Sequence, residues 1–294
     1  MGVAYVTAAD IAATLDDGLP ELARLAAQAG SGSTTLVLDR PVDVPIGATL
    51  LLGARGTNTE VASVQGAVPD PTAATSLTLA APLAQTHLVG EALEDVTALE
   101  HWAQAASRLV DAETLGAPEW FAAGVLVDET IPAQVNRDGN LKLCTQRSPI
   151  VSIQALTLQQ SPMDPIVSVP VANVWAPDSG EVKRGYSLTA YLANIGGNTS
   201  LISWPFTPGT RLRAVLSYTA GFAFPSIASP PAGCPAPPAD LVRFTAVLAA
   251  RLWKEKDSGF SDVIGDPTTV GQTAYRKAIP ADVRLGLAGW KRQG

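Results

Sequence analysis

The sequence predicts an α+β protein, with helices near both ends of the chain and strands between them. Apolar residues recur at helical spacing in residues 7–15, 97–110 and 241–252. Residues 32–95 are rich in Thr, Val, Leu and Gly and divide into several short segments, which is typical of a small β barrel or sandwich. Residues 211–218 alternate apolar and polar side chains, as a half-buried strand does.

The first predicted helix covers residues 7–15. Thr7 and Asp10 form a variant of the capping box, in which each side chain satisfies a backbone N–H at the start of a helix. The same apolar spacing continues from Pro20 to Gly30. Because proline suits the first turn of a helix and glycine often ends one, we expect a second helical segment there.

The β-rich segment is predicted to be an insertion between helices. We expect its strands at residues 34–38, 48–52, 60–64 and 76–79. A helical pattern returns at Thr97, which forms a second candidate capping box with Glu100. Inserted domains are tolerated where their two ends lie close together. The sequence therefore predicts an inserted β module at residues 32–95, within a domain made of residues 1–31 and 96–294.

Further strands are expected between residues 125 and 220, and the clearest cover residues 150–158, 187–193 and 211–218. Asn136–Asn140 contains the Asp-Gly pair that hairpin turns favour. Residues 160–185 contain several prolines and glycines, so we expect an exposed loop there.

Two helices are predicted near the C-terminus. Asp240 is a suitable N-cap for the first, at residues 241–252. Residues 256–273 are polar and show little periodicity, which favours a flexible loop. The last helix is expected at residues 280–290, with one apolar face made of Val283, Leu287 and Trp290.

Charge is distributed unevenly over the 294 residues, whose net charge is −7. Residues 1–240 contain 11 Lys and Arg against 22 Asp and Glu, whereas residues 241–294 contain 9 against 5. The basic C-terminal segment therefore faces an acidic partner, or it packs on the acidic body of its own chain. The acidic body argues against a protein that grips nucleic-acid phosphates over its whole surface.

The sequence contains few residues that match catalytic or metal-binding motifs. The two histidines and two cysteines have no partners at metal-ligand spacing, and no Gly-x-Ser-x-Gly elbow is present. Gly30–Ser33 lacks the lysine of a phosphate-binding loop. We therefore predict a protein that is not an enzyme, without a metal or cofactor. An enzymatic interpretation would depend on His87 and Glu60.

Two motifs carry a resemblance to a known family. Residues 106–111 read Ala-Ser-Arg-Leu-Val-Asp and are followed by Thr114 and Trp120-Phe121. Residues 211–222 read Arg-Leu-Arg-Ala-Val-Leu-Ser-Tyr-Thr-Ala-Gly-Phe and are followed by Pro225 and a helix. In this order the motifs resemble the head-to-tail connector (adaptor) proteins of long-tailed bacteriophages. The resemblance covers residues 1–30 and 96–294, whereas residues 34–91 resemble a small β module of other phage virion proteins.

The resemblance implies a connector-type helical bundle with a β-sheet and hairpin region, to which the β module is added. It implies a non-catalytic virion protein, made in the host bacterial cytoplasm, that forms a ring, usually a dodecamer, at the neck between the portal and the tail. The implied partners are the portal protein, a tail terminator or stopper protein, and further copies of the chain. DNA would pass through the ring without sequence-specific binding, and no membrane would be involved.

The resemblance also assigns candidate contact residues. The C-terminal helix and basic tail would face the portal, through Arg276, Lys277, Arg284, Leu287, Trp290, Lys291 and Arg292. Loops in the strand-rich region would contact a neighbouring subunit or the tail side, through Arg137, Asp138, Asn140 and Trp175.

An alternative interpretation is a virion module that binds a surface or a carbohydrate through the β unit. Binding of this kind favours an exposed aromatic ring on which a sugar can stack. Residues 32–95 contain no Trp, Tyr or Phe, which weighs against this alternative.

Overall fold

A computed structural model describes residues 2–15, 19–53, 58–114, 116–135, 140–160, 166–171, 174–175, 187–191, 211–255 and 279–291. The chain divides into two compact units. The barrel unit comprises residues 4–106 and 242–283, and the sheet unit comprises residues 1–3, 107–241 and 284–294.

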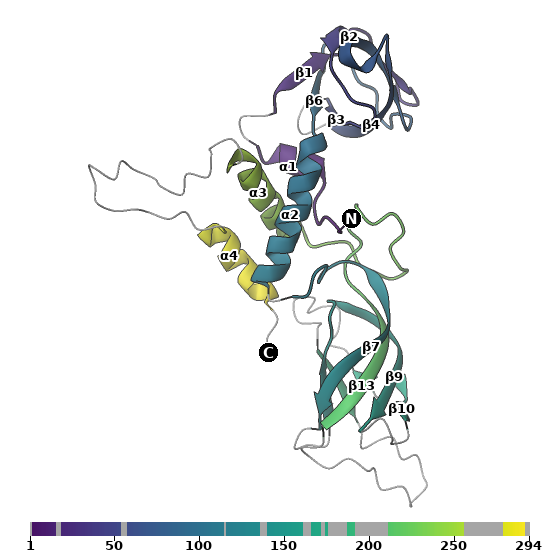
Figure 1. The fold of residues 1–294 in the computed structure, drawn as a ribbon, viewed down its shortest axis with the longest axis vertical. Helices are drawn as coiled ribbons and strands as arrows, with labels where there is room; N and C mark the ends of the chain where they lie inside the picture. Colours follow the sequence, from purple (N-terminus) through teal and green to yellow (C-terminus); the bar gives the residue numbers. More distant parts are fainter. Residues whose placement is uncertain are drawn as a thin grey trace, which may run out of the picture. The chain divides into compact units, whose positions relative to one another are not determined.

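A six-stranded antiparallel sheet dominates the barrel unit (Figure 1). Its strands follow the order β1-β6-β3-β4-β5-β2. Their bounds are β1 Glu21–Arg24, β2 Thr35–Val42, β3 Thr49–Leu52, β4 Glu60–Val68, β5 Ala74–Leu79 and β6 Ala92–Asp95. The four strands predicted between residues 34 and 79 are therefore present.

The two end strands of this sheet meet and nearly close it into a barrel. Leu25 follows β1 and forms an antiparallel bridge with Leu38 of β2. Beside it, the N–H of Ala26 donates to the carbonyl oxygen of Val37 over 2.8 Å. Closure of this kind pairs backbone groups that an open sheet edge would expose. Alternate side chains, such as Leu36 and Leu38, fill the interior.

The helix predicted from Pro20 to Gly30 is wrong, because β1 lies there and pairs with β6. Ala23 and Leu25 are buried while Arg24 between them is exposed, which is the two-residue period of a strand. A short apolar segment fits both periods, and here pairing with a distant strand decides the outcome. The sheet thus begins at Glu21, ahead of the boundary predicted for the module.

Side-chain hydrogen bonds fix the first turns of α1 and α2. At α1 (Ala8–Ala13), the predicted capping box is confirmed, since Thr7 and Asp10 bond to each other's backbone N–H. At the start of α2 (Thr97–Glu113), Thr97 and Glu100 instead bond to Thr49 of β3, over 2.9 Å each. These bonds attach the first turn of α2 to the barrel.

The sheet unit contains a four-stranded antiparallel sheet of order β10-β9-β13-β7 and a three-stranded sheet of order β11-β12-β8. Their bounds are β7 Gly124–Gln134, β8 Asn140–Cys144, β9 Ile150–Gln159, β10 Val167–Val169, β11 Val174–Trp175, β12 Ser187–Tyr191 and β13 Arg211–Ala220. The alternation predicted for β13 is confirmed, because Leu212, Ala214, Leu216 and Tyr218 are buried.

The loop predicted between the strands of this unit is partly wrong, and two other predicted segments are not described. Residues 160–185 were expected to be a loop, but β10 and β11 lie within them. The tip of the predicted hairpin turn, residues 136–139, and the loop predicted at residues 256–273 lie outside the described residues.

The last two predicted helices are present, but the first of them begins at Ala239, so Asp240 lies in its first turn and is not the predicted N-cap. Helix α3 spans Ala239–Glu255, and α4 spans Ala281–Leu287 with a 3-10 turn, Ala288–Trp290, after it. The predicted apolar face of α4 is confirmed, since Val283, Leu287 and Trp290 are all buried.

The predicted fold class is wrong, because the described part of the chain is mostly β-sheet and its four short helices form no bundle. The helices predicted from apolar spacing near residues 7, 97, 241 and 280 are present. The residues' own patterns also predicted strands in most of the remaining chain. The helical bundle came from the family resemblance alone, and the long strands β7, β9 and β13 stand against it.

A close backbone crossing joins the end of β13 to the segment before β7. The N–H of Phe222 donates to the carbonyl oxygen of Phe121, and the N–H of Ala123 donates to that of Phe222, over 2.7 and 3.0 Å. Gly221 has a positive φ of 94°, and a Cβ there would lie 2.1 Å from the carbonyl oxygen of Ala122. Only glycine allows the two backbones to approach this closely.

We expect Gly221→Ala to lower the free energy of unfolding of the sheet unit by about 3 kcal/mol or more, because strain at positive φ adds to a backbone clash. Gly233→Ala is the matched control: its φ is also positive, 86°, but the nearest atom to its Cβ would be a Val151 methyl at 3.4 Å. That variant should lose about 1–2 kcal/mol. Urea unfolding followed by tryptophan fluorescence measures both, and equal losses would contradict the crossing argument.

Candidate functional site

The candidate portal-facing residues are divided between the protein interior and an ion-pair cluster. Leu287 and Trp290 are buried, and the Trp290 ring contacts those of Phe121 and Phe222, with centroids 5.7 and 6.2 Å apart. Glu113, at the end of α2, forms ion pairs through Oε1 with Arg284 and Lys291, at 3.2 and 2.9 Å. Arg276, Lys277 and Arg292 lie outside the described residues.

The second candidate set lies around the three-stranded sheet. Asn140 begins β8, opposite Tyr191 of β12, and Trp175 ends β11, opposite Thr189 of β12. The structure describes the backbone of these residues. Arg137 and Asp138 lie outside the described residues.

For Arg284 and Lys291, the structure agrees with the alternative in which basic residues pack on the chain's own acidic body. The outward side of α4 carries a residue that the sequence analysis missed. Leu285 is 76% exposed and follows Arg284, whose side chain is 49% exposed. Its position off the Val283–Leu287–Trp290 stripe is the signal that could have identified it.

A buried polar junction organises the sheet unit around Tyr218. The Tyr218 hydroxyl donates to Oε2 of Glu129 and accepts from the backbone N–H of Arg147. Glu129 Oε1 accepts from the backbone N–H of Gln146 over 3.0 Å. Burial, together with the hydrogen bond to the Glu129 carboxylate, raises the pKa of Tyr218 well above its usual value. The hydroxyl therefore stays protonated and available as a donor.

The junction continues from Arg147 to the end of α2. Arg147 Nη2 donates to Glu119 Oε2 over 2.8 Å, and its Nη1 donates to the carbonyl oxygen of Ala122 over 3.3 Å. The backbone N–H of Glu119, which has a positive φ of 61°, donates to Asp111 Oδ2 over 2.8 Å. Side chains from both resemblance motifs, Asp111 and Tyr218, thus belong to one hydrogen-bonded network.

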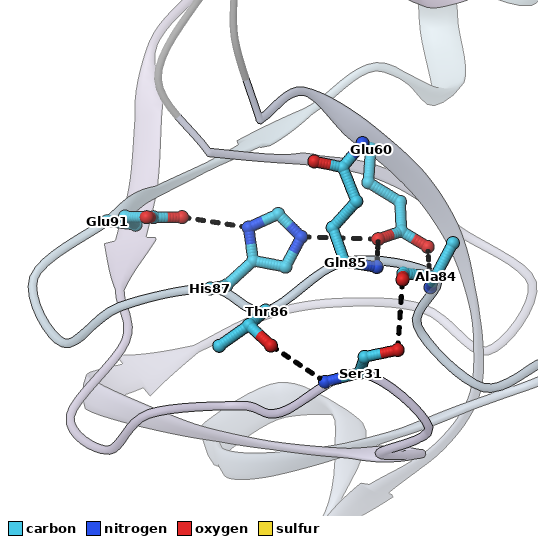
Figure 2. Close-up of polar contacts among 7 residues, drawn as sticks. All are labelled: Ser31, Glu60, Ala84, Gln85, Thr86, His87 and Glu91. Carbon is cyan, nitrogen blue, oxygen red and sulfur yellow. Dashed lines mark hydrogen bonds and ion pairs between the residues drawn. The ribbon is translucent and has the colours of Figure 1, made fainter.

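A second polar cluster lies in the barrel unit, where His87 is fully buried between two carboxylates (Figure 2). Its Nδ1 is 2.8 Å from Oε2 of Glu91, and its Nε2 is 3.3 Å from Oε2 of Glu60. Backbone bonds between His87 and Ala29, over 2.8 and 3.0 Å, hold the same segment. The cluster joins β4 to the segment from Ala84 to Glu91, which pairs through His87 with Ala29.

Glu60 also anchors the segment before His87. Its carboxylate accepts from the backbone N–H groups of Ala84 and Gln85 over 2.6 and 3.0 Å (Figure 2). Burial opposes ionisation of Glu60, but these two bonds and the His87 ring outweigh it and lower the pKa of the carboxyl group. The ionised form of Glu60 is therefore favoured by the fold.

The cluster brings together His87 and Glu60, the two residues on which an enzymatic interpretation would depend. A general base must reach the proton of a substrate. In this cluster the imidazole is buried and each ring nitrogen already faces a carboxylate. This geometry favours a structural clamp. Among the described residues, no group of three or more His, Cys, Asp or Glu side chains is arranged to hold a metal ion.

Two further observations concern the class of protein. In the part of the chain that the structure describes, no helix is both long and apolar enough to span a membrane. Comparison with protein-family models and with curated protein sequences gives no match to this chain.

We expect Glu60→Gln to destabilise the barrel unit at neutral pH by about 1–3 kcal/mol, because hydrogen bonds to an ionised group are lost. Folding lowers the pKa of Glu60 from its ordinary value of 4.5. Its stabilising contribution is thus fully present above pH 4.5 and is lost as the pH falls through the lowered value. The difference in unfolding free energy between wild type and variant should shrink accordingly in acid.

Asp43→Asn is the control for this experiment, since Asp43 is an exposed carboxylate in the same unit. Its unfolding free energy should stay within about 0.5 kcal/mol of wild type. A Glu60→Gln effect of the same size at pH 3 and at pH 7 would contradict the role assigned to the ionised carboxylate.

A double-mutant cycle should detect the Tyr218–Glu129 hydrogen bond. Tyr218→Phe leaves a buried carboxylate with one donor fewer, so we expect a loss of about 2–3 kcal/mol. In combination with Glu129→Gln, the loss should be smaller than the sum of the two single losses by at least about 1 kcal/mol. Chemical denaturation of the four proteins measures this coupling, and additive losses would show that the bond contributes nothing.

Proposed function

We propose that this chain is a non-catalytic structural protein of a tailed bacteriophage, which assembles as a ring between the portal and the tail. Its partners are the portal protein, a terminator or stopper protein of the neck, and further copies of itself. The ring surrounds the channel through which DNA leaves the head. The chain is made in the bacterial cytoplasm and functions in the virion.

The observation that carries this proposal is the convergence of the two resemblance motifs. Asp111 of the first motif is linked through Glu119 and Arg147 to Tyr218 of the second. Phe121 and Phe222, also one from each motif, are joined by a backbone hydrogen bond and stack at 6.3 Å. The two motifs, about 100 residues apart in the sequence, thus meet at one junction, and this supports treating them as one feature of the chain.

Exposed apolar side chains on both units suit a protein that assembles. A ring interface is heterologous, so each subunit needs two different complementary surfaces. Leu285 on α4 and Val127 on β7 are 76% and 70% exposed, and Leu88 and Val89 of the barrel are 57% and 62% exposed. In the described barrel these side chains are aliphatic, which suits protein contacts better than sugar stacking.

The acidic charge of the chain fits the proposed channel. A strongly basic lumen would attract DNA phosphates and slow their passage. With a net charge of −7, the subunit lacks an overall attraction of this kind. Since Leu287 and Trp290 are buried, the portal contact is better assigned to the outward side of α4, with Leu285 at its centre.

Mixing the purified chain with the portal ring of the same particle tests the proposal directly. We expect rings, or one bound copy per portal subunit, in negative-stain images and in mass measurements. A chain that stays monomeric and does not bind the portal would contradict the proposed function.

The same assay tests the contact surface. Leu285→Ser should weaken binding to the portal at least about tenfold, because an apolar side chain buried at an interface is lost. Val61→Ser, at a 41% exposed position of β4, is the control and should bind as wild type does. Unchanged binding of Leu285→Ser, with the wild type bound, would move the contact away from α4 while leaving the proposed function intact.

A further inference from the structure

A neutral imidazole and two ionised carboxylates have too few hydrogen-bond donors for the contacts of the Glu60–His87–Glu91 cluster. A neutral imidazole has one N–H donor and one lone-pair acceptor, whereas an ionised carboxylate only accepts. Both ring nitrogens of His87 face carboxylate oxygens, at 2.8 and 3.3 Å. One of these contacts would then set a nitrogen lone pair against a carboxylate, inside the protein.

From this geometry we infer that the cluster is a proton-binding site, which holds one proton more than a neutral imidazole and two carboxylates would. With the additional proton on the ring, His87 donates to Glu60 and to Glu91 at once. With the proton on Glu91 instead, that carboxyl group donates to Nδ1, and the neutral ring donates through Nε2 to the ionised Glu60. Either arrangement supplies the donor that the cluster needs. This inference does not depend on the proposed function.

The surroundings of the ring fit a buried cation. Glu60 is the first residue of β4, and Glu91 immediately precedes β6. Among the described residues, no other charged side chain is hydrogen-bonded to the ring. Gly53 approaches Cε1 of His87, and a Cβ there would lie 3.3 Å from it. Burial costs an ion most of its hydration, so two flanking carboxylates are the partners that a buried imidazolium requires.

The bound proton acts on an exposed apolar turn. His87 and Glu91 flank Leu88, Val89 and Gly90, and the N–H of Glu91 donates to the carbonyl oxygen of Leu88 over 3.2 Å. The side chains of Leu88 and Val89 are more than half exposed. The His87–Glu91 contact therefore clamps the base of a turn that presents two aliphatic side chains to solvent.

Hydrogen bonds around the cluster connect this turn to the rest of the barrel. The N–H of Gly90 donates to the carbonyl oxygen of Leu25. Ser31 bonds to Ala84 and Thr86 (Figure 2). With Glu60 bound to the other side of the ring, strand β4 holds the segment from Ala84 to Glu91 against the barrel closure. Loss of the proton would set a lone pair against a carboxylate in the middle of this connection.

Nuclear magnetic resonance of the full chain, labelled with nitrogen-15 in its histidine rings, tests the inference at neutral pH. The chain has two histidines, and the exposed His101 on α2 serves as an internal reference, with His101→Gln to assign the signals. We expect both ring nitrogens of His87 to carry protons. A neutral ring beside a protonated Glu91, detected by the carboxyl carbon-13 shift, also places the additional proton in the cluster.

A neutral His87 ring beside two ionised carboxylates would overturn the inference. Glu91→Gln provides the matched variant, because the introduced amide can donate to Nδ1 and the cluster then balances with a neutral ring. That variant should lose one ring proton from His87 at the same pH, and retention of both would also contradict the argument. If the variant does not fold, the wild-type spectrum still decides the question.

Discussion

The sheet unit depends on one close backbone contact, where the Gly221–Phe222 segment crosses the Phe121–Ala123 segment. Because the crossing leaves no room for a Cβ at residue 221, the two backbones are near enough to form hydrogen bonds. The crossing also sets the start of β7 and the end of β13, and it brings Phe121 and Phe222 to the Trp290 ring. The Tyr218 junction lies only a few residues away and fixes the loop between β8 and β9 on the same structure.

The barrel unit depends on closure of its sheet and on one buried polar cluster. Its sheet has two end strands, and the bonds between Leu25–Ala26 and Val37–Leu38 join them and nearly close the barrel. Next to this closure lies the Glu60–His87–Glu91 cluster, so the barrel combines an apolar interior with one polar connection at its rim. Apolar burial supplies the general driving force, while the cluster specifies which segments meet.

Local patterns predicted most elements, and the errors come from interactions between distant residues. The stripe of α4 and the alternation of β13 are complete within short segments, so the sequence alone predicted them. Residues 20–30 fit a helix and a strand equally well, and only β6, about 70 residues later, decides between them. His87 and Glu60 could be named as candidates, but their contact with each other could not, because side chains from separate segments meet only through the fold. The helical bundle failed because a family resemblance was extended to an architecture that these residues do not build.

Because Trp290 lies far along the sequence from Phe121 and Phe222, the aromatic cluster forms late in synthesis. Its ring completes a cluster whose other members, Phe121 and Phe222, leave the ribosome much earlier. The ribosome emits a chain at about 5–20 residues per second, so these aromatic rings wait on the order of ten seconds for their last neighbour. During that interval the surface that Trp290 later covers is open to solvent and to other chains. The aromatic cluster is therefore complete only once residue 290 is free to fold onto it.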